Sequence, residues 1–144
     1  MYTMTFEELK NRIRDLGFEE DTTMREYESI VANATDKAVQ TIYDTIVYPY
    51  REYFNTYLGL DDEGNSKVIR PNKITVETED TAEIGLPDRV LNLVPLLASY
   101  FVWLDDDQVK ASVYKNQYED VKDLLILDFQ RPQKLTFYGG LRFD

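Results

Sequence analysis

Residues 86–104 read LPDRVLNLVPLLASYFVWL, and this stretch constrains the fold more than any other part of the chain. A helix here would carry one wide apolar stripe and further apolar residues on its other sides. A helix that is apolar nearly all round has to be covered by other elements. The most apolar part, residues 90–104, is shorter than the roughly 20 residues that a membrane span needs. We therefore expect a central, buried helix with a stripe of Val90, Leu93, Val94, Leu97, Tyr100, Phe101 and Leu104, and with Leu91, Leu96 and Trp103 on the other sides.

Two prolines should shape this helix. Pro87 suits the first helical position, N1, where a missing backbone N–H costs nothing. Pro95 lies inside the helix, where the missing N–H and the ring should produce a kink.

Three aspartates, residues 105–107, follow the apolar stretch. With Asp105 as the N-cap of a further helix, Gln108 is N3 and completes a capping box, and Leu104 and Val109 take the positions of a hydrophobic staple. The other two aspartates would lie at the positive end of the helix dipole. We therefore expect an antiparallel helix pair joined at a corner formed by Asp105 and Gln108. A metal site is the alternative, and it would need further carboxylates from elsewhere in the chain.

A capping box also marks the first helix of the chain. Thr5 and Glu8 have the required spacing, and Met4 and Leu9 stand at the staple positions. The helix should begin at Thr5 and stop at Gly17, a natural C′ residue.

Two long helices are indicated by apolar residues that recur every three or four positions. The first should start near Thr23, and its pattern fades at Pro49, where the helix either ends or kinks and continues to about Tyr57. The second should run from about Asp106 to Asp128, with a core-facing stripe of Val109, Val113, Tyr114, Tyr118, Val121, Leu124 and Leu125.

The remaining segments differ in character. Residues 58–86 contain a polar loop and two short β-type runs around Pro71, which predict an inserted β-hairpin excursion. Residues 131–144 follow the last helix and predict an extended C-terminal tail. The expected fold is mainly α: a single domain over residues 1–144, built as an antiparallel bundle of about four helices with the hairpin excursion and the tail.

The amino-acid composition limits the kinds of catalytic and metal-binding sites that the chain can form. The chain has no histidine and no cysteine, which excludes disulfides, thiolate and imidazole ligands, and Ser–His or Cys–His catalysis. The net charge of −11 disfavours binding to nucleic acid. A calcium loop starting at Asp61 fails, because its sixth and twelfth positions hold Ser66 and Asn72 instead of Gly and Glu. We expect no enzyme activity, cofactor or metal, and a soluble product without a signal peptide.

Aromatic residues are frequent, with 11 Tyr, 7 Phe and 1 Trp. Tyrosine suits surfaces that are apolar on one side and wet on the other, as at protein–protein interfaces. Ordinary core and rim packing explains the same composition, so this feature leaves both interpretations open.

Residues 86–125 resemble the C-terminal helix pair of tailed-bacteriophage head–tail adaptor proteins, also called connector or head-completion proteins. The order of the surrounding elements is similar as well. The resemblance lies in a Leu-Pro helix start, an apolar helix, an acidic corner and a Tyr-Glu pair, here Leu86-Pro87, Ala98-Ser99-Tyr100, Asp105 to Asp107 and Tyr118-Glu119.

The resemblance implies a structural virion protein that forms a homo-oligomeric ring of about twelve copies beneath the portal protein. Such a ring joins the head to the next neck or tail protein and extends the DNA channel. DNA passes through the lumen without specific binding, and no cofactor, reaction or membrane is involved. The implied location is the neck of the virion, with assembly in the host cytoplasm.

The C-terminal tail is the expected portal-binding element. It is locally basic in an acidic chain, and an extended segment of this kind can add a strand to a sheet edge, as tails of the resembled family do on the portal. The alternative is a tail that folds back on its own helices. The expected portal-binding residues are Leu135, Thr136, Phe137, Tyr138, Gly139, Gly140, Leu141, Arg142 and Phe143.

Two other functions remain open at this point. One is a small acidic interaction domain, for example an inhibitor that imitates nucleic acid. The other is a metal-dependent enzyme that uses only carboxylates.

Overall fold

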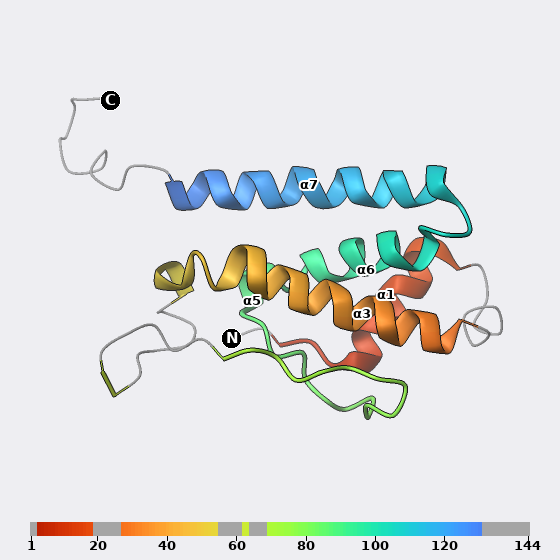
Figure 1. Ribbon diagram of the computed structural model, residues 1–144, viewed down its shortest axis with the longest axis horizontal. Coiled ribbons are helices and arrows are strands. Elements are labelled where there is room, and N and C mark those ends of the chain that lie inside the picture. Colours follow the sequence, from red (N-terminus) through yellow and green to blue (C-terminus); the bar gives the residue numbers. More distant parts are fainter. Residues whose placement is uncertain (1–2, 19–26, 55–61, 64–68, 131–144) are drawn as a thin grey trace.

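The computed structural model describes residues 3–18, 27–54, 62–63 and 69–130. This part of the chain is mainly helical, as expected (Figure 1). In chain order, the elements are α1 (Phe6–Gly17), α3 (Glu28–Ile42), the π-helical turn η1 (Tyr43–Val47), the 3-10 turn η2 (Arg51–Phe54), α5 (Asp88–Leu91), α6 (Leu93–Trp103) and α7 (Gln108–Gln130).

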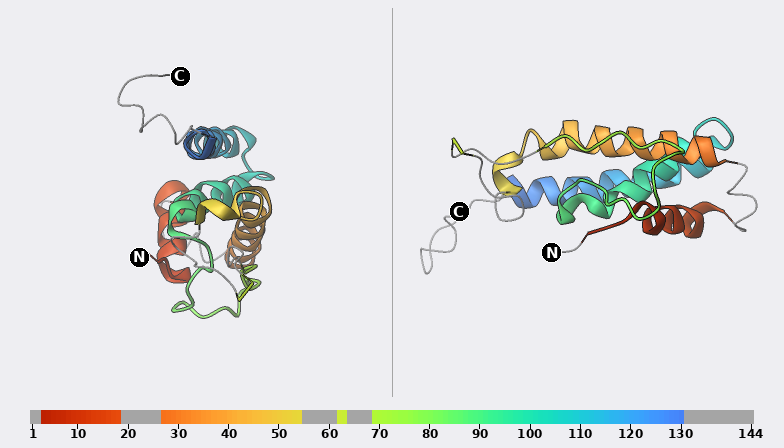
Figure 2. Two further views of the ribbon diagram at one scale, coloured as in Figure 1. Left: turned by 90° about the vertical axis from the view of Figure 1, so that its left-hand side faces the viewer. Right: turned by 90° about the horizontal axis from the view of Figure 1, so that it is seen from below.

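Helix α6 is the centre of the bundle and contacts α1, α3 and α7. The end-on view in Figure 2 shows α1 and α3 on its two sides, with α7 as a separate layer above it. The chain reverses direction between α6 and α7, so the two helices run antiparallel (Figure 1). The expectation of a central, buried helix is confirmed, since Leu93, Val94, Leu97 and Ala98 are all almost fully buried.

The start of α1 follows local sequence rules. The Thr5 hydroxyl accepts a hydrogen bond from the backbone N–H of Glu8 at 3.2 Å, and the Glu8 carboxylate accepts one from the backbone N–H of Thr5 at 3.2 Å. Met4 and Leu9 at the staple positions are both fully buried. The predicted capping box is therefore present.

The second helix ends differently from either expectation. Helix α3 stops at Ile42, a π-helical turn follows, and the backbone N–H of Tyr48 bonds to the carbonyl of Tyr43 at 2.9 Å. Pro49 explains the change, because it has no N–H for the carbonyl of Thr45 and its ring clashes with a continued α-helix. The expected start near Thr23 lies outside the described residues.

Both prolines affect the central helix as expected, but Pro87 lies one position before N1, the position predicted for it. Pro87 is the N-cap, with φ −58° and ψ 148°, so Asp88 is the first helical residue. The kink expected from Pro95 is a break at Asn92, which separates α5 from α6. Pro95 cannot donate to the carbonyl of Leu91, and this missing bond accounts for the break one turn before the proline.

The predicted β-hairpin is wrong for the residues that the structure describes. Residues 69–75 have no regular secondary structure, turns follow between residues 76 and 81, and one isolated bridge joins Thr5 and Glu83. Helix side chains satisfy the backbone that a hairpin partner would have paired. The Asp36 carboxylate accepts from the N–H of Ile74 at 3.0 Å, and the Gln40 amide donates to the carbonyl of Pro71 at 3.0 Å.

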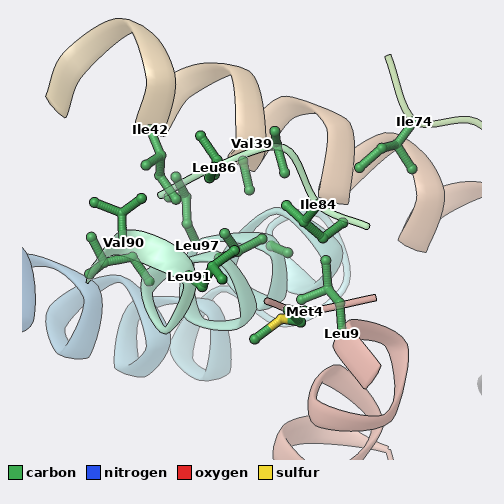
Figure 3. Packing of buried hydrophobic residues seen from close by; sticks show 14 of the residues in the cluster. Met4, Leu9, Val39, Ile42, Ile74, Ile84, Leu86, Val90, Leu91 and Leu97 are labelled. Carbon is green, nitrogen blue, oxygen red and sulfur yellow. The ribbon is translucent and has the colours of Figure 1, made fainter. Parts of the chain in front are cut away.

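The excursion also contributes to the core. Ile74, Ile84 and Leu86 are buried, and Figure 3 shows Leu86 next to Val39 and Ile42 of α3 and Ile74 beside the same helix farther along. The excursion therefore belongs to the same hydrophobic cluster as the helices.

Candidate functional site

The corner between α6 and α7 is capped by Asp107, which corrects the expectation for Asp105 and Gln108. The Asp107 carboxylate accepts a hydrogen bond from the backbone N–H of Lys110 at 3.0 Å. Asp105 lies in the exposed turn before the cap, and Gln108 is the first residue of α7, not N3. The N–H of Asp107 bonds to the carbonyl of Trp103 at 2.8 Å, so α6 extends its hydrogen bonding through the first two aspartates. Only the third aspartate is then free to cap α7.

The acidic corner does not gather metal ligands. In the part of the chain that the structure describes, no group of three or more acidic side chains is placed to hold a metal ion. The aspartates of the corner have a capping and turn-forming role instead.

The inner face of α7 is aromatic. Tyr114, Tyr118 and Phe129 are buried against the bundle, with Ala111 between them and the corner. Burial of the phenol raises the pKa of Tyr118 to about 12, against a weaker opposing effect from a hydrogen bond with Thr45. Tyrosine rings bury more apolar area than valine side chains, so this face packs on α6 in preference to the valines.

The opposite face of α7 corrects the predicted core stripe. Val109 is 79% exposed and Leu124 is 68% exposed, and Val113, Val121 and Leu127 are exposed as well. Val109 and Leu127 lie about five turns apart on one line of the helix. Figures 1 and 2 show no other described element on the side of α7 that faces away from α6. The outer stripe, defined as Val109, Val113, Leu124 and Leu127, is therefore apolar and unpartnered among the described residues.

Acidic groups accompany the outer stripe. Asp120 and Asp123 are exposed and lie on the same side of α7, by their helical spacing. Large exposed apolar patches with polar neighbours are typical of interaction sites. The outer stripe was missed in the sequence because three of its residues, Val109, Val113 and Leu124, were assigned to the core-facing side of the helix. The apolar residues of this helix span more of its circumference than a helix in an outer layer can bury, and this feature of the sequence indicates an exposed apolar face.

The start of α7 is tied to the end of α1. The Tyr114 hydroxyl donates to the carbonyl of Leu16, and burial raises its pKa. The Lys110 ammonium donates to the carbonyl of Gly17 at 2.5 Å and lies 3.7 Å from the ring centre of Trp103. These contacts cover helix-end carbonyls that α1 cannot pair internally.

The far end of α7 meets the tyrosine-rich segment that follows α3. The Phe129 ring stacks on Tyr53 at a centroid distance of 4.8 Å and meets Phe54 edge-on at 5.4 Å. Arg89 lies over the Phe129 ring at 4.8 Å and bonds to Asp128 at 2.7 Å. At this end of the bundle, Tyr53, Phe54 and Phe129 therefore contribute to packing between elements.

A groove with a volume of about 390 Å³ lies between α1, α3 and the loop at 76–80. Phe6 and Val31 form part of its wall, and the Lys10 ammonium bonds to the Asp80 carboxylate at 2.5 Å beside it. This arrangement is an ion pair between an ammonium group and a carboxylate, and an ammonium group is not a nucleophile.

The predicted portal-binding residues, 135–143, lie outside the described residues. No helix in the described part of the chain combines the length and apolar character of a membrane span. The chain matches no protein-family model, and comparison with curated proteins and with solved structures gave no match.

Proposed function

We propose that the chain is a head–tail adaptor of a tailed bacteriophage, which forms a ring of about twelve copies beneath the portal protein. The observation that carries the proposal is the antiparallel pair of α6 and α7 with an acidic corner, in the segment that resembles such adaptors. One helix of the pair is central and the other is bound on one face only. This geometry suits a scaffold that presents a helix face to partners.

The charge of the chain supports the same function. A ring of about twelve subunits at −11 each would place on the order of −130 charges around a channel. A DNA duplex repelled by the wall slides without binding to it. The subunits would sit between the portal and the next neck or tail protein.

The portal contact is assigned to residues 135–143 of the C-terminal tail, which comprises residues 131–144. The tail carries Arg131, Lys134 and Arg142 against the single acid Asp144, in contrast to the acidic remainder of the chain. An extended basic and apolar segment can add a strand to a sheet edge of the portal. Many tails in one ring would supply the affinity that a single tail lacks.

The test is the location of the protein in tailed particles produced by the genome that encodes it. Antibody against the chain should label the neck, and heads from a strain without the gene should lack tails. Complementation with a variant that lacks residues 133–144 tests the tail separately, since this variant should stay unattached to heads. Label on the capsid shell or tail tip, or tailed particles without the gene, would contradict the adaptor function.

The acidic interaction domain predicts a different outcome. In that case the chain would be recovered as a monomer bound to a basic partner, away from particles. A carboxylate-based enzyme would reveal itself by a divalent-ion effect on stability that EDTA reverses.

A further inference from the structure

A segment or protein that covers the outer stripe of α7 has to offer both apolar and basic side chains. The exposed apolar side chains of the stripe form two pairs, Val109 with Val113 and Leu124 with Leu127, at the two ends of a line about 27 Å long at 1.5 Å per residue, and polar residues Asn116, Gln117 and Asp120 lie between the pairs. Asp120 and Asp123 lie on the same side of the helix. A partner that covers the stripe therefore has to bury apolar groups and face two carboxylates.

A second copy of α7 does not meet this requirement. Parallel pairing of two outer stripes would bring Asp120 and Asp123 of one copy close to the same aspartates of the other, and antiparallel pairing would leave the two Asp120 side chains about one helical turn apart. Like charges at such a contact oppose association, and each whole chain adds a net charge of −11.

The C-terminal tail has the complementary chemistry. Residues 131–144 contain three basic residues and one acidic residue, and their apolar residues alternate with others. The basic residues are Arg131, Lys134 and Arg142, and the alternating apolar residues are Leu135, Phe137, Leu141 and Phe143.

Chain length allows the tail to reach the whole stripe. The tail begins directly after α7 ends at Gln130, close to Leu127. Fourteen residues span up to about 46 Å when extended, which exceeds the length of the stripe. Pro132 cannot continue the helix, and it disfavours helical geometry at Arg131. A reversal at this point would direct the tail back along α7.

We propose that residues 133–143 lie along the outer stripe of α7 of the same chain in the free subunit, antiparallel to the helix. The apolar residues of the tail cover the stripe, and Lys134, which lies near the end of α7 in this arrangement, compensates the charge of Asp123 and Asp120. Attachment to the same chain gives the tail a millimolar effective concentration, which favours its own helix over another copy. The inference does not rest on the adaptor function. If the tail also binds the portal, it has to leave α7 first, and the contact then keeps unassembled subunits inactive.

Introduced cysteines test the proposal directly, because the chain has none of its own. The double variant Val113→Cys/Leu141→Cys should form an intrachain cross-link with a short bismaleimide. The matched control is Ser112→Cys/Leu141→Cys, since Ser112 is exposed and adjacent but lies about 100° away from Val113 around the axis of α7. Circular dichroism of both variants verifies that the bundle is intact.

The expected result is a severalfold higher intrachain yield for the Val113 pair, unchanged on tenfold dilution. Adding Asp120→Lys and Asp123→Lys should reduce this yield toward that of the control. Equal yields for the two pairs would overturn the proposal. Predominantly interchain products would overturn it as well, because they would assign the stripe to the tail of another copy. The free protein is used throughout, so failure of the adaptor function would not affect the outcome.

Discussion

A methyl group on Gly17 would lie 2.5 Å from the indole nitrogen of Trp103, closer than two such atoms can approach. The Trp103 ring is held between Phe18, at a centroid distance of 4.9 Å, and the Lys110 ammonium, at 3.7 Å. Gly17 was expected as a C′ residue, but it belongs to α1, and Phe18 is the C-cap. The glycine is therefore required by the close approach of α6 and not by its own backbone conformation.

Gly17→Ala should destabilise the protein by about 1 kcal/mol. The clash costs roughly 1–3 kcal/mol and the gain in helix propensity is about 1 kcal/mol, so the net loss lies between about 0 and 2 kcal/mol. Urea denaturation measures the change, with Gly85→Ala as the control because its nearest neighbour would be at an ordinary 3.5 Å. A stabilised Gly17→Ala variant would mean that the indole is free to move.

Asp107→Ala should cost about 1 kcal/mol, because it removes the side-chain acceptor for the N–H of Lys110. Asp107→Asn should cost much less, since asparagine is an equally good N-cap. Asp105→Ala, in the exposed turn, should change stability by no more than about 0.5 kcal/mol. Chemical denaturation that ranks Asp105 above Asp107 would show that the corner is capped in the other register.

Leu97→Ala and Leu124→Ala make the same chemical change at opposite sites. Leu97 is 1% exposed at the centre of the bundle, so its truncation should cost roughly 2–5 kcal/mol. Leu124 lies on the outer stripe, and its truncation should cost about 0.5 kcal/mol or less. Similar losses in thermal and urea unfolding would argue that another element covers α7.

Alkaline pH should destabilise the protein through Tyr118. Burial raises its pKa from about 10 when unfolded to about 12 when folded, so the neutral phenol favours the folded state. This contribution is complete below pH ~10 and is lost as the pH rises toward 12. Unfolding free energies measured across this range should fall less steeply for Tyr118→Phe. Parallel curves for the two proteins would show that Tyr118 titrates normally.

Assembly of the proposed ring should respond to salt. Subunits with a net charge of −11 repel one another, and added salt screens this repulsion. Light scattering and sedimentation should show more assembly at high ionic strength. Assembly that weakens with salt would point to contacts between opposite charges instead.

Local signals in the sequence determined the elements whose partners are close in the chain. The box of Thr5 and Glu8 closes within one turn, and it forms as predicted. Pro95 breaks the central helix because its missing N–H acts on a carbonyl four residues away. The apolar residues of 90–102 required burial on most sides, and the structure places this helix at the centre of the bundle.

Only the tertiary structure decided between options that are equivalent locally. Three consecutive aspartates can each cap a helix, and the hydrogen bond from Asp107 to Trp103 selected the third. Residues 69–76 suit a strand, but Asp36 and Gln40 of α3 supply their hydrogen bonds in place of a hairpin partner. Helix α7 has apolar residues over more of its surface than one neighbour can cover. Its tyrosines can bury more area than its valines, so the tyrosines face α6 and Val109 and Leu124 face outward. Which face packs on α6 depends on the distance between the two helices, and the sequence of one helix does not contain this information.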